Sequence, residues 1–179
     1  MNNKMVNRFW GKEVFREKMA RFFVCSDIHG AESRLESALS KHQDVDTVIV
    51  CGDLEMEFYD VEEIIRRNTS RSIDIRMVRG NCDSYYSSSS GVPDQITVTL
   101  SPHSRALVTH GHLYHASAEI MAYSALEKNC NVVIYGHTHR QQDKEIYGIR
   151  FLNPGSIRNG NYMIIESESN GAIQTQLYG

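Results

Sequence analysis

Short apolar runs recur along this chain, and each ends in side chains that can bind a cation. The first run, residues 22–25, is followed by Asp27 and His29. Four more segments repeat the arrangement, at residues 48–53, 76–81, 106–112 and 132–139. Runs of this kind are typical of buried strands, and residues two apart in extended backbone point to the same side. The pattern predicts a sheet whose strand ends converge on a metal site, with Asp27 and His29 facing one ion.

Segments whose apolar residues have helical spacing lie between the first three of these predicted strands. Residues 31–42 carry apolar side chains at helical spacing, as do residues 61–65. Asp60 and Glu63 have the spacing of a capping box at the start of the second helix. This alternation of strands and helices predicts a parallel sheet with right-handed crossovers.

The second half of the chain has more strands and closer turns. Residues 95–100 and 105–109 predict an antiparallel hairpin, and a helical stripe over residues 117–129 precedes a buried strand at 131–135. Four short strands are then expected to form a β meander, at residues 142–146, 149–152, 161–166 and 172–177. Together the elements predict two facing sheets with helices on their outer sides.

A polar segment, residues 82–91, follows the third strand. Serine is its most common residue, and this composition predicts a mobile loop. The segment is either a plain connector or a rim beside the site, in which Tyr85 or Tyr86 contacts a leaving group.

Length and charge limit the classes of function. A chain of 179 residues is expected to form one domain with a core that needs no disulfide. The net charge of -3 and the scattered charges give no general nucleic-acid footprint. The four cysteines lack CxxC spacing, so we expect reduced thiols and a cytoplasmic protein. No segment has the apolar length of a signal-peptide core or a membrane span, so no membrane association is expected.

Residues 1–20 precede the first strand and are expected to form an N-terminal extension. A loose helical stripe runs through Phe9, Trp10, Val14, Phe15 and Met19. We expect a helix that packs on the domain or on a neighbouring subunit; a contact with a membrane or another partner is the alternative.

The residues at the strand ends form a mixed set of oxygen and nitrogen donors. They are Asp27, His29, Asp53, Asn81, His110, His112, His137 and His139. Such a mixture suits Mn, Fe, Zn, Co or Ni better than Ca or Mg. The set is too large for one ion, but it fits two ions that a carboxylate bridges and that share a nucleophilic hydroxide. Each motif alone is weak evidence, whereas the whole set in this order predicts hydrolysis of a phosphate ester.

The motifs and their order resemble those of the calcineurin-like metallophosphoesterases, which are D-x-H, GD, GN, H and GHxH. Here they read Asp27-Ile28-His29, Gly52-Asp53, Gly80-Asn81, His110 and Gly136-His137-Thr138-His139. The short length, Gly80-Asn81-Cys82-Asp83 and Asn153-Pro154-Gly155-Ser156 are most similar to the small YfcE-like phosphodiesterase branch, which is related to Vps29. The resemblance covers residues 21–179 and implies an α/β fold, a four-layer α/β/β/α sandwich of two mixed sheets flanked by helices.

The resemblance also implies which residues bind each ion. Asp27, His29 and His139 would bind one divalent transition-metal ion, and Asn81, His110 and His137 the other, with Asp53 bridging. Manganese is the ion most expected, and Ni, Zn, Fe or Co are the alternatives. The amide of Asn81 is left near the phosphate, which makes Asn81 a candidate catalytic residue.

Two positions depart from the family pattern. Larger relatives place a proton-donating histidine after the asparagine, and here that position is Cys82, a poor substitute as an acid. We expect His112 to protonate the leaving group instead; the alternatives are a packing role for His112, leaving groups that need little protonation, or slow turnover.

Relatives often carry a Pro-Arg pair after the Asn-Pro-Gly-Ser turn, whereas this chain continues with Ile157 and Arg158. Arg158 is either a phosphate contact or a surface residue.

The expected activity is hydrolysis of a small phosphodiester through a hydroxide that bridges two metal ions. A phosphomonoesterase or nucleotide phosphatase is the enzymatic alternative. A Vps29-like protein-interaction module without turnover is the alternative outside enzymes. A DNA nuclease is disfavoured by the slightly acidic composition, and a homodimer is an expectation that rests on the resemblance.

Overall fold

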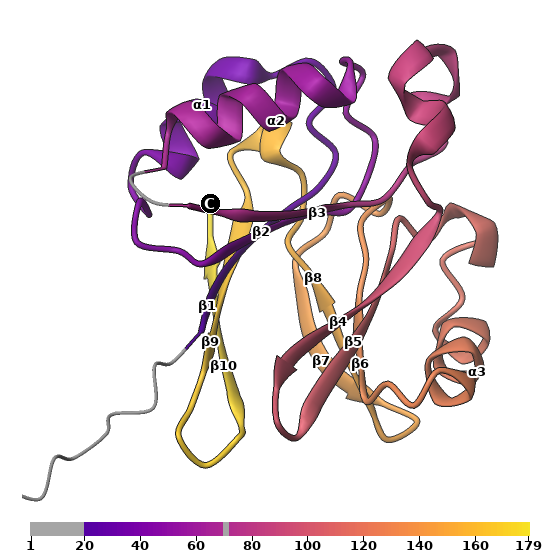
Figure 1. The fold of residues 1–179 in the computed structure, drawn as a ribbon. Coiled ribbons are helices and arrows are strands. Elements are labelled where there is room, and N and C mark those ends of the chain that lie inside the picture. The colour runs from indigo at the N-terminus through magenta and orange to yellow at the C-terminus, as the bar shows by residue number, and fades with distance from the viewer. Residues whose placement is uncertain (1–19, 70–71) are drawn as a thin grey trace, which may run out of the picture.

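A computed structural model describes residues 20–69 and 72–179, so the helix expected in the N-terminal extension lies outside the described residues. Within the described ranges, ten strands form two five-stranded sheets (Figure 1). The first sheet has the order β10-β9-β1-β2-β3. Its strands are β1 (Arg21–Cys25), β2 (Thr47–Val50), β3 (Asp74–Met77), β9 (Tyr162–Ser167) and β10 (Ile173–Tyr178).

The second sheet has the order β4-β5-β6-β8-β7. Its strands are β4 (Gln95–Ser101), β5 (Ser104–Thr109), β6 (Val132–Ile134), β7 (Gln142–Ile146) and β8 (Ile149–Asn153). The predicted hairpin is confirmed, because β4 and β5 pair in the antiparallel sense.

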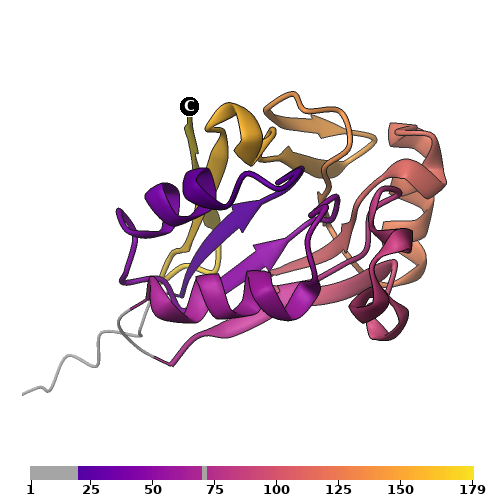
Figure 2. The same cartoon turned by 90° about the horizontal axis from the view of Figure 1, so that it is seen from above.

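The central strands of each sheet are parallel. In the first sheet β1 pairs with β2 and β2 with β3, and in the second β5 pairs with β6 and β6 with β8. Figure 2 shows β1 and β2 side by side and running in the same direction. Because parallel strands have their carboxyl ends at the same edge of a sheet, the segments after β1, β2 and β3 share one edge, as do those after β5 and β6.

Among the described residues, three α-helices cover the outer faces of the two sheets. They are α1 (Glu32–Leu39), α2 (Phe58–Arg67) and α3 (Ala118–Glu127). Figure 1 shows α1 and α2 on one side of the molecule and α3 on the other. No helix within the described residues is long and apolar enough to cross a membrane.

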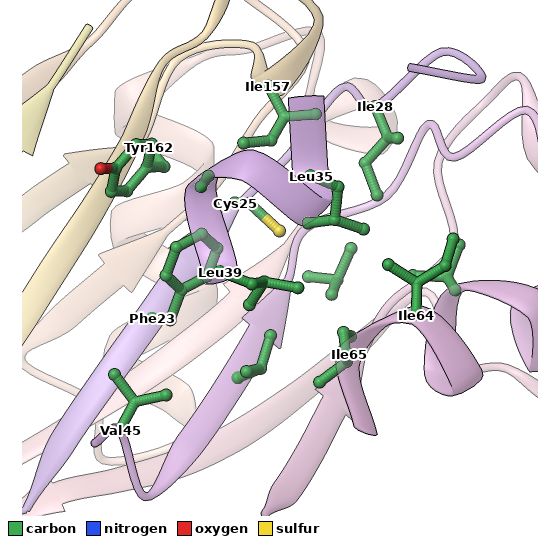
Figure 3. Close-up of a cluster of buried hydrophobic side chains, with 14 of the residues drawn as sticks. Phe23, Cys25, Ile28, Leu35, Leu39, Val45, Ile64, Ile65, Ile157 and Tyr162 are labelled. Carbon is green, nitrogen blue, oxygen red and sulfur yellow. The ribbon is translucent and has the colours of Figure 1, made fainter. Parts of the chain in front are cut away.

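Three apolar clusters in the described part of the chain hold these layers together. Alternate residues of a strand face opposite sides, so Phe23 of β1 packs under α1 and α2 with Leu35, whereas Val24 packs between the sheets with Val108. Figure 3 shows the first of these clusters, with Phe23 and Leu35 among its side chains. The third cluster joins the second sheet to α3 through Met121. The predicted four-layer α/β/β/α sandwich is therefore confirmed.

The start of α2 differs from the sequence prediction. The helix begins at Phe58 with Glu57 at its N-cap, so Asp60 and Glu63 lie inside the helix and form no capping box. The Phe58 N–H donates to the Ser88 hydroxyl at 2.8 Å, and Glu57 accepts from the Ser88 N–H at 3.0 Å. The capping-box prediction is wrong because a side chain from a distant segment satisfies the helix N-terminus.

Ser88 belongs to the polar segment that was predicted to be a loop. This segment contains two short 3₁₀ helices, η1 (Asp83–Tyr85) and η2 (Ser87–Gly91). Tyr85, one of the two tyrosines considered for a leaving-group contact, is 91 % exposed.

The four C-terminal strands do not form one meander. β7 and β8 pair with each other in the second sheet, whereas β9 and β10 join the first sheet, where β9 pairs with β1 in the antiparallel sense. The turn between β8 and β9 contains η4 (Ile157–Asn159), and Ile157 packs in the cluster under α1. The meander prediction is wrong because sheet membership depends on pairing with β1 and β6, which local turn signals do not encode.

Candidate metal centre

The proposed ligands lie in tight turns that follow the strand ends. Five of them have left-handed backbone with positive φ: Asp27 (53°), His29 (47°), Asp53 (53°), His137 (66°) and His139 (57°). The premise that Asp27 and His29 meet because their backbone is extended is therefore wrong. Left-handed backbone is costly for residues other than glycine and concentrates at functional sites. The side chains of Asp27 and His29 meet because of these turns, and not because alternate residues of an extended strand face the same side.

Three side chains from the first and last of these turns form one cluster, here called the Asp27 triad: Asp27, His29 and His139. Its ligand atoms all lie within 4.8 Å of one another. His139 Nε2 is 3.1 Å from Asp27 Oδ1 and 3.2 Å from His29 Nε2. The Asp27 side chain is fully buried, whereas that of His139 is 42 % exposed.

A second cluster, here called the Asp53 triad, consists of Asp53, His110 and His137. Its ligand atoms also lie within 4.8 Å of one another, and His110 Nε2 is 3.2 Å from Asp53 Oδ2. Asp53 and His110 are both buried. The His110 Nδ1–H donates to the Cys51 carbonyl at 2.7 Å, which leaves Nε2 as the nitrogen with a free lone pair when the ring is neutral.

The two triads are adjacent. Asp27 Oδ2 accepts a hydrogen bond from the backbone N–H of His137 at 3.1 Å, so a ligand of one triad holds the backbone of the other. Glycines allow this close approach: a Cβ at Gly136 would overlap the Ser26 hydroxyl, and one at Gly80 would overlap Asp53 Oδ1. The sequence-predicted residues are thus brought together from both sheets.

Asn81 lies beside the Asp53 carboxylate. The residues on either side of it contact that carboxylate, because Gly80 packs against Asp53 and the Cys82 N–H donates to Asp53 Oδ1 at 2.8 Å. The Asn81 side chain is exposed, and its Nδ2 is 3.3 Å from the Cys82 thiol. Cys82 also lies within ligand distance of His29 and Glu55.

Opposing effects set the charges of the Asp53 triad. Burial acts to raise the pKa of Asp53, but the His110 ring and the Cys82 N–H outweigh it and hold the pKa well below its ordinary value of 3.8. Burial acts to lower the pKa of His110, but Asp53, with Asp27 farther away, raises it above 6.5. Asp53 is thus ionised at neutral pH, and His110 must release its proton when a metal ion binds through Nε2.

The Asp27 carboxylate has the opposite balance. Burial raises its pKa above the ordinary value, and the neighbouring His110, Ser26 and His139 lower it by less. A cation bound beside Asp27 would favour the ionised form of this buried carboxylate.

The donor atoms fit divalent transition-metal ions. Asp27 Oδ1 and His110 Nε2 are buried, and neither makes a hydrogen bond of good geometry within the described residues. Buried polar atoms in proteins are otherwise nearly always satisfied. Carboxylate oxygens and imidazole nitrogens at these separations are the ligands that Mn, Fe, Co, Ni and Zn accept. Six of the candidate ligands named from the sequence therefore form two clusters that could each hold an ion.

His112 lies against the Asp53 triad. It begins η3 (His112–Tyr114), and its ring centroid is 5.4 Å from that of His110 and 6.4 Å from that of His137. Burial and the positive His110 ring lower its pKa. His112 Nδ1 is buried without a hydrogen-bond partner within the described chain.

Sequence reasoning missed the role of Asp83. This buried carboxylate accepts hydrogen bonds from the backbone N–H groups of Asp53 (2.9 Å), Leu54 (2.7 Å), Glu55 (3.3 Å) and Gly80 (2.8 Å). Through these hydrogen bonds Asp83 joins the turn that contains Asp53 to the turn that contains Asn81. The signal in the sequence was its place in the motif Gly80-Asn81-Cys82-Asp83, because an aspartate in a polar loop does not by itself indicate a structural role.

The strand-end turn around Asp27 has a similar clamp from η4. The Ser156 hydroxyl donates to the Asp27 carbonyl at 2.8 Å, and the Ile157 N–H donates to the Ser26 carbonyl at 2.9 Å. The Arg158 N–H donates to the Asp27 carbonyl at 3.4 Å, while its side chain is exposed. The Asn153-Pro154-Gly155-Ser156 turn thus supports the candidate metal centre through contacts with the backbone around Asp27.

Comparison with known proteins identifies the family. The model of the calcineurin-like phosphoesterase superfamily domain matches residues 20–169. The probable metallophosphoesterase YsnB of Bacillus subtilis is 32 % identical over 138 residues, which are 75 % of this chain and 73 % of that protein. The phosphodiesterase YfcE of Escherichia coli is 28 % identical over 159 residues, which are 78 % of this chain and 80 % of that protein.

The fold also matches solved structures. Vacuolar Protein Sorting 29 from Cryptosporidium parvum superposes with a TM-score of 0.66 and 18 % identity, over 89 % of this chain and 97 % of that one. Identity at this level shows the shared fold alone. With the family model and the B. subtilis relative, the evidence is sufficient: this chain belongs to the calcineurin-like phosphoesterase superfamily.

Proposed function

We propose that this protein is a dinuclear metal-dependent phosphodiesterase that hydrolyses a small phosphodiester. The observation that carries the proposal is the pair of adjacent triads at the converging strand ends, each with one carboxylate and two imidazoles. Relatives named as phosphodiesterases favour a diester over a monoester.

The proposal gives each ligand a role. Asp27, His29 and His139 would hold one ion, His110, His137 and the side-chain oxygen of Asn81 would hold the other, and Asp53 would serve both. Two bound divalent ions supply a nucleophilic water at neutral pH and neutralise the phosphate oxygens. Manganese is proposed as the native ion from the family resemblance, with Ni, Zn, Fe or Co as alternatives, since this donor set accepts all of them.

Two residues act directly on the substrate in this proposal. The Asn81 amide donates to a phosphate oxygen, because its side chain is exposed and the next residue, Cys82, contacts the Asp53 carboxylate through its backbone N–H. His112 donates a proton to the leaving oxygen, because its ring flanks His110 and His137. Cys82 is a poor proton donor, since burial and Asp53 raise the pKa of its thiol to about 12.

The setting of the protein is part of the same proposal. All four cysteines are free, which agrees with a reducing cytoplasm. A homodimer is proposed from the family resemblance, and light scattering on the purified full chain tests it.

The activity is tested with bis(p-nitrophenyl) phosphate beside p-nitrophenyl phosphate. Protein stripped with a chelator receives Mn, Ni, Zn, Co or Mg singly, and Asp53→Asn serves as the inactive variant. We expect metal-restored cleavage of the diester that exceeds cleavage of the monoester and disappears in the variant. A faster monoester reaction would support the phosphomonoesterase alternative.

A protein-interaction module without turnover is the second candidate, since this chain shares its fold with Vacuolar Protein Sorting 29. That candidate predicts two bound ions by elemental analysis with no turnover of either ester. Diester turnover that depends on Asp53 excludes it.

A further inference from the structure

We propose that Glu55 is a positioning residue that fixes the ring of His29 for metal binding, a role that rests on the proposed function of the two triads. Glu55 lies two residues after Asp53 and belongs to neither triad. Its carboxylate oxygen Oε1 is 2.9 Å from His29 Nδ1. No motif of the family resemblance includes this residue.

The contact determines which ring nitrogen of His29 is free. An ionised carboxylate can only accept hydrogen bonds, so His29 Nδ1 carries the hydrogen and donates it to Glu55. The lone pair of the neutral ring is then on Nε2, which lies 3.2 Å from His139 Nε2 and 4.0 Å from Asp27 Oδ1. Glu55 thereby aims the ligand atom of His29 into the Asp27 triad.

The backbone of Glu55 is built for this contact. Glu55 has a positive φ of 50°, a conformation that costs free energy for a residue with a side chain. The Asp83 carboxylate accepts the Glu55 N–H at 3.3 Å and fixes the turn. The strained backbone and its clamp therefore hold the Glu55 side chain over His29.

The stability of the fold does not explain this pair. The Glu55 side chain is 41 % exposed, and exposed ion pairs contribute little to the free energy of unfolding. In metal sites, by contrast, a carboxylate on the far nitrogen of a ligating histidine orients the ring, and its loss costs about 10- to 100-fold in metal affinity or activity.

The test compares three variants by metal binding as well as by activity. Glu55→Ala removes the acceptor, Glu55→Gln keeps an oxygen that accepts from Nδ1, and Glu63→Ala removes an exposed glutamate of α2 as the matched control. Mn²⁺ is titrated into each chelator-stripped full chain and followed by calorimetry. Nitrogen-15 spectra of the metal-free proteins report which His29 nitrogen carries the hydrogen.

We expect Glu55→Ala to weaken the binding of one of the two ions by about 10- to 100-fold and to reduce diester turnover with it. Glu55→Gln should retain most of the affinity, and Glu63→Ala should match the wild type. The spectra should show hydrogen on Nδ1 in the wild type and Glu55→Gln, and a mixture of tautomers in Glu55→Ala.

Two results would overturn the inference. One is a Glu55→Ala protein that binds both ions as tightly as the wild type. The other is a loss of metal affinity in Glu55→Gln as large as that in Glu55→Ala, up to the loss of one whole ion in both variants. That result would make Glu55 a ligand together with Cys82 and His29. A wild-type protein that binds no metal would instead contradict the proposed function itself.

Discussion

The two triads differ in what holds their histidines. In the Asp53 triad, His110 is fully buried and donates to a main-chain carbonyl, that of Cys51. In the Asp27 triad, His29 contacts the exposed side chain of Glu55, and His139 is 42 % exposed. A main-chain carbonyl in the core is a fixed acceptor, whereas a surface side chain must be ordered at an entropic cost. We therefore expect the Asp53 triad to bind its ion tightly and the Asp27 triad to exchange its ion more readily.

The largest expected effect comes from Asp53→Asn, because Asp53 is the residue proposed to serve both ions. Loss of one carboxylate charge between two cations removes several kcal/mol of stabilisation, so diester turnover should fall by at least about a thousandfold. Steady-state kinetics and metal analysis check this result, with Asp60→Asn on α2 as the control. Retained turnover would show that the two triads work without a shared carboxylate.

His112→Ala tests whether His112, which lies against the Asp53 triad, protonates the leaving group. A proton donor matters most when the leaving group is a strong base, and general acids contribute at least about 100-fold in such cases. We expect a loss of that order on a 2′,3′-cyclic nucleotide, whose leaving group is an alkoxide, and a much smaller loss on bis(p-nitrophenyl) phosphate. Equal losses on both substrates would place His112 in packing or metal support.

Two glycine variants separate the triads from each other. A Cβ at Gly80 would collide with Asp53, and one at Gly136 would collide with Ser26 and crowd Asp27. Gly80→Ala should weaken mainly the tightly bound ion and Gly136→Ala mainly the exchangeable one, by about 10- to 100-fold in each case. Calorimetric titration with Mn²⁺ measures both affinities.

Gly91→Ala is the matched control for these glycine variants, since a Cβ there meets no atom within 4 Å and its backbone φ is ordinary. The comparison between the triads fails if Gly80→Ala and Gly136→Ala weaken the same ion.

Asp83→Asn tests the clamp of the Asp53 triad. The amide group of asparagine would face some of the four backbone N–H groups that the carboxylate now accepts, and an unmet buried donor costs about 1–3 kcal/mol. The free energy of unfolding, measured in urea, should fall by that amount, with a smaller loss in metal affinity. Unchanged stability would mean that Asp83 is not the clamp described above.

The smallest effect concerns pH and the metal-free protein. The lowered pKa of Asp53 adds stability above its ordinary value of 3.8, which is lost as the pH falls through the folded-state pKa. The raised pKa of His110 adds stability below 6.5, which is lost as the pH rises through the folded-state pKa.

The pair of Asp53 and His110 therefore stabilises most between these two values. At about pH 5.5 Asp53 is ionised and His110 is protonated, whereas at about pH 9 His110 has lost its proton. In urea unfolding, the difference in free energy of unfolding between the metal-free wild type and Asp53→Asn should therefore be larger at about pH 5.5 than at about pH 9. A gap that widens toward pH 9 would contradict the assigned charges.

Sequence patterns predicted the layers of the fold and the clustering of six of the candidate ligands, because both depend on local signals. Apolar runs mark buried strands, and carboxylate and imidazole side chains at their ends mark the site, as Asp27, Asp53 and His110 show. The split of the C-terminal strands between two sheets depends on contacts with β1 and β6 across the fold, which turn signals do not contain.

The supporting residues were also beyond reach of the sequence. Glu55 and Asp83 are ordinary polar residues in loops, and their contacts with His29 and Asp53 arise only when separate turns are folded together. The left-handed backbone of Asp27 and His29 was hidden for the same reason, because tertiary hydrogen bonds hold it against local preference.

The most direct test of the account is a crystal structure of the protein grown with Mn²⁺, with anomalous difference maps that locate the ions. The account predicts two peaks, one within the Asp27 triad and one within the Asp53 triad, with Asp53 in contact with both. At limiting Mn²⁺, the peak in the Asp53 triad should be the stronger. A single peak, or ions bound away from these residues, would contradict the dinuclear centre.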